Sequence, residues 1–189
     1  IPSADPPHRT SPGASAQDRL HMVRLALEPA GDHLVADGSE LNRVGKSYMV
    51  DTLKALREEN PNESISLILG TDAFIELMTW HEWQQLFTLA HIIVASRPNL
   101  PISQLNNKLK GELFTEFEKR NSHDYNTISS LTHGLIYTYE FTSLEVSGTS
   151  LRKRIQNGLS LKYLLPDNVI NYIQDYSLYE ESRSESNTE

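Results

Sequence analysis

Ile65-Ser66-Leu67-Ile68-Leu69, followed by Gly70, is the segment that decides the fold. It is a short run of leucine and β-branched residues stopped by a glycine, which is typical of a buried parallel strand. HIIVAS, residues 91–96, repeats the pattern and is followed by Pro98. GLIYTYEF, residues 134–141, alternates enough to predict a further strand. We therefore expect at least three strands, and the first two should be buried.

Helical patterns separate these strands. Residues 16–27 place Leu20, Val23 and Leu27 at helical spacing, and a proline or glycine bounds several of the other helical segments. Strands that alternate with helices predict right-handed βαβ units and an open, doubly wound parallel sheet of the α/β class. Ligands of such sheets bind beyond the carboxyl ends of the strands. The remaining expected helices are 48–59, 79–89, 105–119, 149–157 and one that opens at residue 166.

Length and composition set the class of protein. A chain of 189 residues with 38% hydrophobic residues predicts one domain, residues 1–179, followed by a disordered acidic tail, residues 180–189. No apolar run is long enough to span a bilayer, so we expect a soluble, cytoplasmic protein. The chain has no cysteine, which leaves oxygen and imidazole as metal ligands. A net charge of −8 argues against a nucleic-acid surface and means that an anionic ligand needs a locally basic pocket.

Small, acidic and aromatic residues follow the first strand. Gly70 and Asp72 come directly after it, and Trp80 and His81 stand where the next helix is expected. Asp72 could hold a ribose hydroxyl or metal-bound water, or it could cap a helix. Trp80 could stack on a flat heterocycle, or it could anchor the core. Trp83 is interpreted as a core residue.

A hydroxyl-rich turn follows the 134–141 strand. Ser147, Thr149 and Arg152 lie at the start of a helix, where amide groups, hydroxyls and a guanidinium can bind the same phosphate. Capping by serine and threonine explains the hydroxyls equally well, but it does not explain an arginine at the positive end of a helix. We therefore favour phosphate binding.

Two further segments could bind anions. Pro6 and Pro7 stiffen a loop that places His8 beside Arg9, although a solvated loop explains this pair as well. Tyr48 and Met49 begin the second helix, whose exposed amides could receive a carboxylate. Simple initiation of the helix accounts for that segment too.

Taken in order, these motifs resemble those of bacterial nicotinate-nucleotide adenylyltransferases, over residues 1 to about 179. The resemblance rests on the order and spacing of the whole set, because each motif alone is weak. It adds Arg19 with Met22, Asp51-Thr52 and Ala95-Ser96-Arg97-Pro98 to the segments above. It implies a Rossmann-like nucleotidyltransferase fold and transfer of AMP from ATP to nicotinate mononucleotide with Mg²⁺, giving deamido-NAD and pyrophosphate in NAD biosynthesis.

The resemblance also implies residue roles. Trp80 would stack on the pyridine ring, amides near Met49 and His81 would receive the nicotinate carboxylate, and Tyr48 belongs to the same pocket. The remaining implied roles are Gly70 and Asp72 on the nucleotide, Arg97 near the adenine, His8 and Arg9 near phosphate, and Ser147, Thr149 and Arg152 on the ATP phosphates.

The sequence departs from the family pattern in three places. Met49 replaces a usual threonine, and Gly148 replaces a usual serine or alanine. The third departure is that family members open with a strand, an H-x-G-H loop and a helix, and this sequence starts after them. We therefore expect no catalytic residue of that loop in this chain, and a chain that is unstable alone because two strand edges would be exposed.

Two alternatives stay open on the sequence. One is a shortened homologue that binds a pyridine nucleotide or a partner without catalysis. The other is a sister enzyme such as pantetheine-phosphate adenylyltransferase. Trp80 and the Pro-Pro-His loop argue against this second alternative.

If Trp80 stacks on the pyridine ring, Trp80→Ala should weaken binding of a pyridine nucleotide by roughly 1–3 kcal/mol, with base–aromatic stacking as the guide. Titration calorimetry on the folded variant measures this loss. An unchanged affinity would remove Trp80 from the site.

Overall fold

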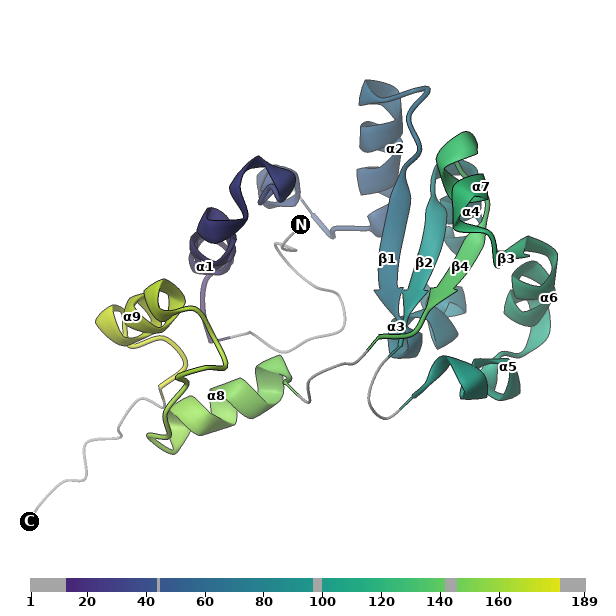
Figure 1. Ribbon diagram of the computed structural model, residues 1–189. Coiled ribbons are helices and arrows are strands. Elements are labelled where there is room, and N and C mark those ends of the chain that lie inside the picture. The colour runs from purple at the N-terminus through teal and green to yellow at the C-terminus, as the bar shows by residue number, and fades with distance from the viewer. Residues whose placement is uncertain (1–12, 44, 97–99, 142–145, 181–189) are drawn as a thin grey trace, which may run out of the picture. The chain divides into compact units, whose positions relative to one another are not determined.

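The computed structural model describes residues 13–43, 45–96, 100–141 and 146–180 (Figure 1). The chain forms two compact units. One is Tyr48–Glu145, which contains the sheet, and the other combines Ile1–Ser47 with Val146–Glu189, which contains helices. Each unit is described by itself below.

The sheet unit is built on four parallel strands. They are β1 (Ser66–Gly70), β2 (His91–Ala95), β3 (Asn121–Ser122) and β4 (Ile136–Tyr139), in the spatial order β1-β2-β4-β3. Ser66 pairs with His91, and Ile92 pairs with Ile136. The expected α/β class and parallel sheet are therefore confirmed, and three of the four strands lie where the sequence predicts them.

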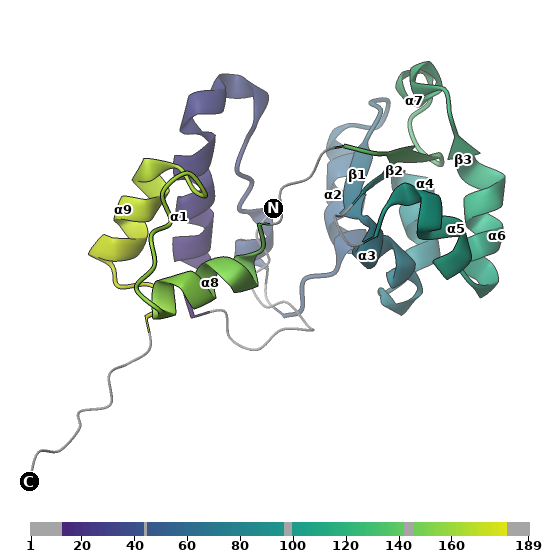
Figure 2. The ribbon, with the colours of Figure 1, turned by 60° about the horizontal axis from the view of Figure 1, so that its bottom comes forward.

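The core lies on one face of this sheet. Paired residues of neighbouring parallel strands point to the same side, so Leu69, Val94, Ile92 and Ile136 project together, and all four are buried. Helix α2 runs alongside β1 in both views and adds Val50 and Leu53 to this core (Figures 1 and 2). The helices of the unit are α2 (Met49–Glu59), α3 (Thr71–Ile75), α4 (Leu86–Leu89), α5 (Leu105–Lys108), α6 (Gly111–Arg120) and α7 (Tyr125–Ser130), with the 3₁₀ turns η3 (Leu77–Thr79), η4 (Trp83–Gln85) and η5 (Ile102–Gln104).

Two expected helices are interrupted. The prediction for 79–89 is wrong at residues 80–82, because Trp80 is extended and Glu82 is left-handed; Thr79 ends η3, and η4 and α4 cover residues 83–89. The helix expected at 105–119 splits into α5 and α6, because Leu109 is extended and Gly111 has a positive φ of 57°. The sequence analysis missed α3, α7 and β3, which have six residues or fewer and too little periodicity to predict a structure.

Arg57 ties together the segments that lead into three strands. Its guanidinium donates to the carbonyl oxygens of Glu63 at 2.7 Å, Leu89 at 2.7 Å and Thr132 at 2.8 Å. These residues precede β1, β2 and β4 respectively. The planar fork of arginine suits such multiple bonding. The amino-terminal edge of the sheet is thereby fixed by one side chain.

His91 reinforces the same edge. The ring is fully buried, with Nε2 3.0 Å from the carbonyl oxygen of Leu131 and Nδ1 accepting the amide hydrogen of Leu135 at 3.1 Å. Since Nδ1 accepts, Nε2 carries the single proton of a neutral imidazole and donates it to Leu131. Burial lowers the pKa of His91. The hydrogen bond to Leu131 opposes that shift, and the nearby positive charges of His133 and Arg57 add to it.

The helical unit packs α1 against α9. Tyr172 donates a hydrogen bond to Asp18 at 2.9 Å, and Asn168 donates one to the carbonyl oxygen of Leu25 at 2.7 Å. Its core centres on Leu161, Val169 and Ile173. The elements are α1 (Ala16–Leu27), α8 (Gly148–Gln156), α9 (Asp167–Asp175), η1 (Glu28–His33) and η2 (Ser39–Asn42). The bounds predicted for α1 and α8, and the start predicted for α9, are confirmed to within one residue. Among the described residues, no helix is long and apolar enough to cross a membrane.

The free energy of unfolding should fall as the pH drops below about 6.5, the pKa of an unfolded histidine. Below that pH the unfolded chain binds a proton at position 91, whereas the folded chain resists it because the pKa of His91 is lowered. One such group contributes a slope of at most about 1.4 kcal/mol per pH unit. Urea unfolding between pH 5 and 8 measures the slope. His91→Gln should flatten it, whereas replacement of the exposed His123 by glutamine should leave it, and an unaltered slope in His91→Gln would contradict the assignment.

Candidate functional site

The carboxyl-terminal edge of the sheet is rigidly built. Buried Thr71, which follows β1, donates its hydroxyl hydrogen to the carbonyl oxygen of Leu100 at 3.0 Å. After β2, the backbone amide of Ser96 donates to the carbonyl oxygen of Tyr139 at 3.0 Å, and the Ser96 hydroxyl accepts from the amide of Phe141 at 3.2 Å. The ends of β1, β2 and β4 are therefore held in place, and Gly70 and Asp72 lie at this edge.

Asp72 lies in the first turn of α3 and is exposed. The N-cap of that helix is Gly70, so Asp72 is not the capping residue. A carboxylate in a first turn complements the helix dipole. From this place Asp72 is also accessible to a ligand that binds beyond the end of β1.

The start of α2 and the Trp80–Trp83 turn meet at one place. The rings of Tyr48 and His81 have centroids 4.3 Å apart, at an interplanar angle of 36°. Tyr48 is the N-cap residue of α2, and its side chain makes no capping hydrogen bond. It therefore does not occupy the backbone amides of the first helical turn. The side chain of Met49 packs against the core, and this residue therefore offers its backbone to a ligand. The sequence-predicted residues Tyr48, Met49 and His81 are thus brought together.

Trp80 leads into the same turn. Its side chain is half-buried and packs against the core, as the anchoring interpretation predicts, but part of it stays accessible. The amide of Trp83 donates to the carbonyl oxygen of Trp80 at 3.3 Å, which closes a tight turn with exposed His81 in its second position. Trp83 packs against the core and meets Phe87 edge to face, which agrees with its interpretation as a core residue.

The structure adds two residues that the sequence analysis did not single out. Lys54 of α2 donates to Glu82 of this turn, with Nζ 2.9 Å from Oε2, and this hydrogen bond lowers the pKa of Glu82. The two positions are 28 residues apart in the chain, and neither belongs to a motif. No local pattern could have joined them.

The hydroxyl-rich turn belongs to the helical unit. Ser147 is the N-cap of α8, and its hydroxyl oxygen accepts from the amide of Ser150 at 3.1 Å. Capping therefore accounts for Ser147 and Ser150. Nη2 of Arg152 lies 3.3 Å from Oγ1 of Thr149, so the guanidinium folds back over the start of the helix. Ser147, Thr149 and Arg152 accordingly lie together, and a helix N-terminus carrying a guanidinium suits an oxyanion.

Gly148 explains how Arg152 reaches that place. A Cβ at position 148 would lie 3.1 Å from Nη1 of Arg152, closer than most real contacts. The glycine that departs from the family pattern therefore makes room for the guanidinium.

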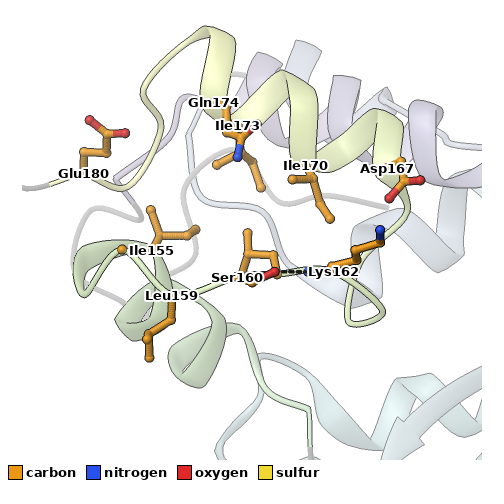
Figure 3. Close-up of a pocket in the computed structure, with 11 residues that line it drawn as sticks. Ile155, Leu159, Ser160, Lys162, Asp167, Ile170, Ile173, Gln174 and Glu180 are labelled. Atoms are coloured by element: carbon orange, nitrogen blue, oxygen red, sulfur yellow. Dashed lines mark hydrogen bonds between the residues drawn. The ribbon is translucent and has the colours of Figure 1, made fainter.

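Described residues of the helical unit line two cavities. One of about 320 Å³ is formed by α1, α8 and α9, and its mostly apolar wall includes Arg19 and Arg152. The other, of about 500 Å³, lies between the end of α8 and α9, with Lys162 and Asp167 beside a floor that includes Ile170 and Ile173 (Figure 3). The second cavity contains none of the sequence-predicted site residues.

The predicted site residues fall into two groups, one in each unit. Tyr48, Met49, Gly70, Asp72, Trp80 and His81 belong to the sheet unit, whereas Ser147, Thr149 and Arg152 belong to the helical unit. His8, Arg9 and Arg97 lie outside the described residues. Within the described part of the chain, no group of three histidine or acidic side chains is placed to hold a metal ion.

Comparison with known proteins defines the class. Residues 1–154 match the model of the cytidylyltransferase-like family. A nicotinic acid mononucleotide adenylyltransferase from Plasmodium falciparum, solved in complex with NaAD, has the same fold, with a TM-score of 0.62 and 16% identity over 93% of this chain and 78% of that one. The chain therefore belongs to the cytidylyltransferase-like family of nucleotidyltransferases.

Relatives narrow this class further. A probable nicotinate-nucleotide adenylyltransferase from Dechloromonas aromatica is 43% identical over 96% of this chain and 83% of its own length. Its namesake from Methylococcus capsulatus is 42% identical over 95% of this chain and 83% of its own. Within the wider class, the chain is thus a member of the nicotinate-nucleotide adenylyltransferase family, as the sequence motifs predict.

Gly148→Ala should leave the melting temperature unchanged or slightly higher, because alanine favours the helix and the end of a flexible arginine can move aside. The displaced guanidinium should weaken binding of inorganic phosphate, measured by calorimetry. Gly158→Ala, at the other end of α8, is the control. Gly158 has a φ of 64°, so alanine there should cost about 1 kcal/mol of stability and leave phosphate affinity unchanged. Equal phosphate affinities in wild type and Gly148→Ala would argue against this role of the glycine.

Proposed function

We propose that this protein transfers AMP from ATP to nicotinate mononucleotide, giving deamido-NAD and pyrophosphate in NAD biosynthesis. The observation that carries the proposal is the contact of the Tyr48 and His81 rings at 4.3 Å in a chain of this family. That contact joins a helix start, a tight turn and an accessible tryptophan at one place. These are the elements that a planar ring bearing a carboxylate requires. Because the reaction consumes ATP, we propose that it takes place in the cytoplasm.

The sheet unit would bind the pyridine nucleotide. Trp80 would stack on the ring, and the backbone amides at Met49 and His81 would donate to the nicotinate carboxylate. Amides donate but cannot accept, so they favour a carboxylate over a carboxamide, whose NH₂ group would face donors. Tyr48 would support this pocket through its contact with His81. Gly70 and Asp72, at the end of β1, would meet the nucleotide.

The helical unit would bind phosphate. Ser147, Thr149 and Arg152 gather at the start of α8, where amides and a guanidinium complement the negative charge of ATP. We extend this role to His8 and Arg9, and we assign Arg97 to the adenine. These three assignments rest on the family motifs.

Mg²⁺ would accompany ATP. The ion usually keeps several waters and is held by substrate phosphates with one or two carboxylates. The described residues fit this mode, because they offer Asp72 at the sheet edge and no group of three ligands that would hold the ion by themselves. When bound, Mg²⁺ would neutralise negative charge on the phosphates.

The chemistry needs no covalent enzyme intermediate. A phosphate oxygen of nicotinate mononucleotide attacks the α-phosphorus of ATP, and the bond from that phosphorus to the β-phosphate oxygen breaks as pyrophosphate leaves. The protein contributes by holding the two nucleotides and by stabilising the charge that grows on pyrophosphate. Arg152 is the described residue best suited to the second task.

A protein that joins this chain to the strand and H-x-G-H loop of the family pattern should release pyrophosphate when given ATP and nicotinate mononucleotide, and chromatography should show deamido-NAD. Arg152→Met should raise the KM for ATP about 10- to 100-fold, the equivalent of one lost charged hydrogen bond. Lys153→Met, which removes the neighbouring exposed cation, is the matched control and should change the KM little.

Three results would count against the proposal. Binding of deamido-NAD without any release of pyrophosphate, by a protein that carries the H-x-G-H loop, would favour a non-catalytic homologue. Reaction with phosphopantetheine, tested in the same panel, would favour the sister enzyme. Equal effects of Arg152→Met and Lys153→Met would remove Arg152 from the phosphate site.

A further inference from the structure

An ion pair joins the two segments of the sheet unit that would bind the nicotinate carboxylate. Nζ of Lys54, on α2, lies 2.9 Å from Oε2 of Glu82, in the Trp80–Trp83 turn. The side chains keep 41% and 37% of their surface exposed. An exposed ion pair of this kind adds little to the free energy of unfolding. We therefore ask which segments of the chain the pair holds in place.

Glu82 has an unusual backbone. Its φ of 51° and ψ of 36° lie in the left-handed region, which residues other than glycine seldom adopt. Two interactions keep it there. The amide of Gln85 donates to the Glu82 carbonyl oxygen at 2.8 Å, and Lys54 binds its carboxylate. A strained residue beside a binding segment needs such support to keep its conformation.

Each residue of the ion pair lies close in the chain to one of the proposed carboxylate donors. Lys54 lies a little more than one turn along α2 from Met49. Because both residues belong to one regular helix, fixing the position of Lys54 also fixes the position of Met49. Glu82 directly follows His81 in the turn. The contact of the Tyr48 and His81 rings joins the same two segments at a second point. Two contacts at different places fix the spacing and the relative orientation of the segments better than one.

The charges of the pair matter as well. Glu82 alone would place a negative charge beside the site of an incoming carboxylate, and like charges repel at this range. Lys54 neutralises that charge through direct contact.

We propose that the Lys54–Glu82 ion pair is a positioning element for the nicotinate carboxylate, and that it sets the preference for the acid over the amide form of the pyridine nucleotide. This inference rests on the proposed function. Neither side chain touches the substrate in this role. The pair holds the amides of Met49 and His81 at the spacing that a carboxylate requires, and it removes a repulsive charge.

The test compares affinities for nicotinate mononucleotide and nicotinamide mononucleotide by calorimetry, so that it does not depend on turnover. Lys54→Met should weaken binding of the acid about two- to fivefold, and binding of the amide by less, so that the preference for the acid falls. Lys54→Arg keeps the cation and should restore the preference. The double variant Lys54→Glu with Glu82→Lys restores a pair of reversed sign and should recover at least part of it.

Glu112→Met is the matched control. Gln84 lies in η4, directly after the Trp80–Trp83 turn, and its Nε2 donates to Oε2 of Glu112 at 2.9 Å. These two residues are also exposed and 28 positions apart. Removal of Glu112 therefore deletes a comparable contact of the segment to a different helix, and the acid-to-amide preference should not change.

The outcomes distinguish a positioning role of the ion pair from a purely structural contact. A preference in Lys54→Met equal to that of wild type, or equal losses for both nucleotides with a lower melting temperature, would reduce the pair to a structural contact. A matching fall in Glu112→Met would show that any loosening of the segment has this effect. Wild-type protein that binds neither nucleotide would overturn the proposed function, and the positioning role with it.

Discussion

Binding of main-chain carbonyl groups by Arg57 is the interaction on which the sheet unit most depends. A guanidinium at the end of α2 reaches the segments that precede β1, β2 and β4, and it binds one main-chain carbonyl oxygen in each of them. Removal of this side chain would delete all three of these hydrogen bonds at once. The buried side chain of His91 joins two of the same segments. One edge of the sheet is thereby occupied by structural contacts.

This arrangement leaves the opposite edge of the sheet for the site that we propose. At the carboxyl ends of the strands, buried Thr71 and Ser96 fix the backbone, and the exposed positions around them carry the residues that the family motifs single out. Rigid support beneath accessible groups is what a site that works by positioning requires. The Trp80–Trp83 turn follows the same principle, because half-buried tryptophans at both ends hold the exposed His81 and Glu82 between them.

Much of the fold could be predicted from sequence because periodicity is local. Leu20 to Leu27, Ile65 to Leu69 and His91 to Ser96 each carry enough apolar residues to define an element, and all three elements are present in the structure. The break at Glu82 could not be predicted, because a left-handed glutamate is held by a lysine 28 residues away. Of the proposed site residues, Tyr48 and His81 in the sheet unit and Thr149 and Arg152 in the helical unit could be named from motifs. That Tyr48 meets His81, and that Gly148 makes room for Arg152, depends on contacts in space that no motif encodes.

The all-parallel sheet has a consequence for the route by which the chain folds. Neighbouring parallel strands cannot be joined by a tight hairpin, so each pairing waits for a crossover to be traversed. The bonds of Arg57 to Leu89 and Thr132 span 32 and 75 residues, and that of His91 to Leu135 spans 44. Closing loops of this length costs chain entropy before any of these contacts is made. Because these contacts are long-range, we expect the sheet unit to fold more slowly than a domain of the same size built from local contacts.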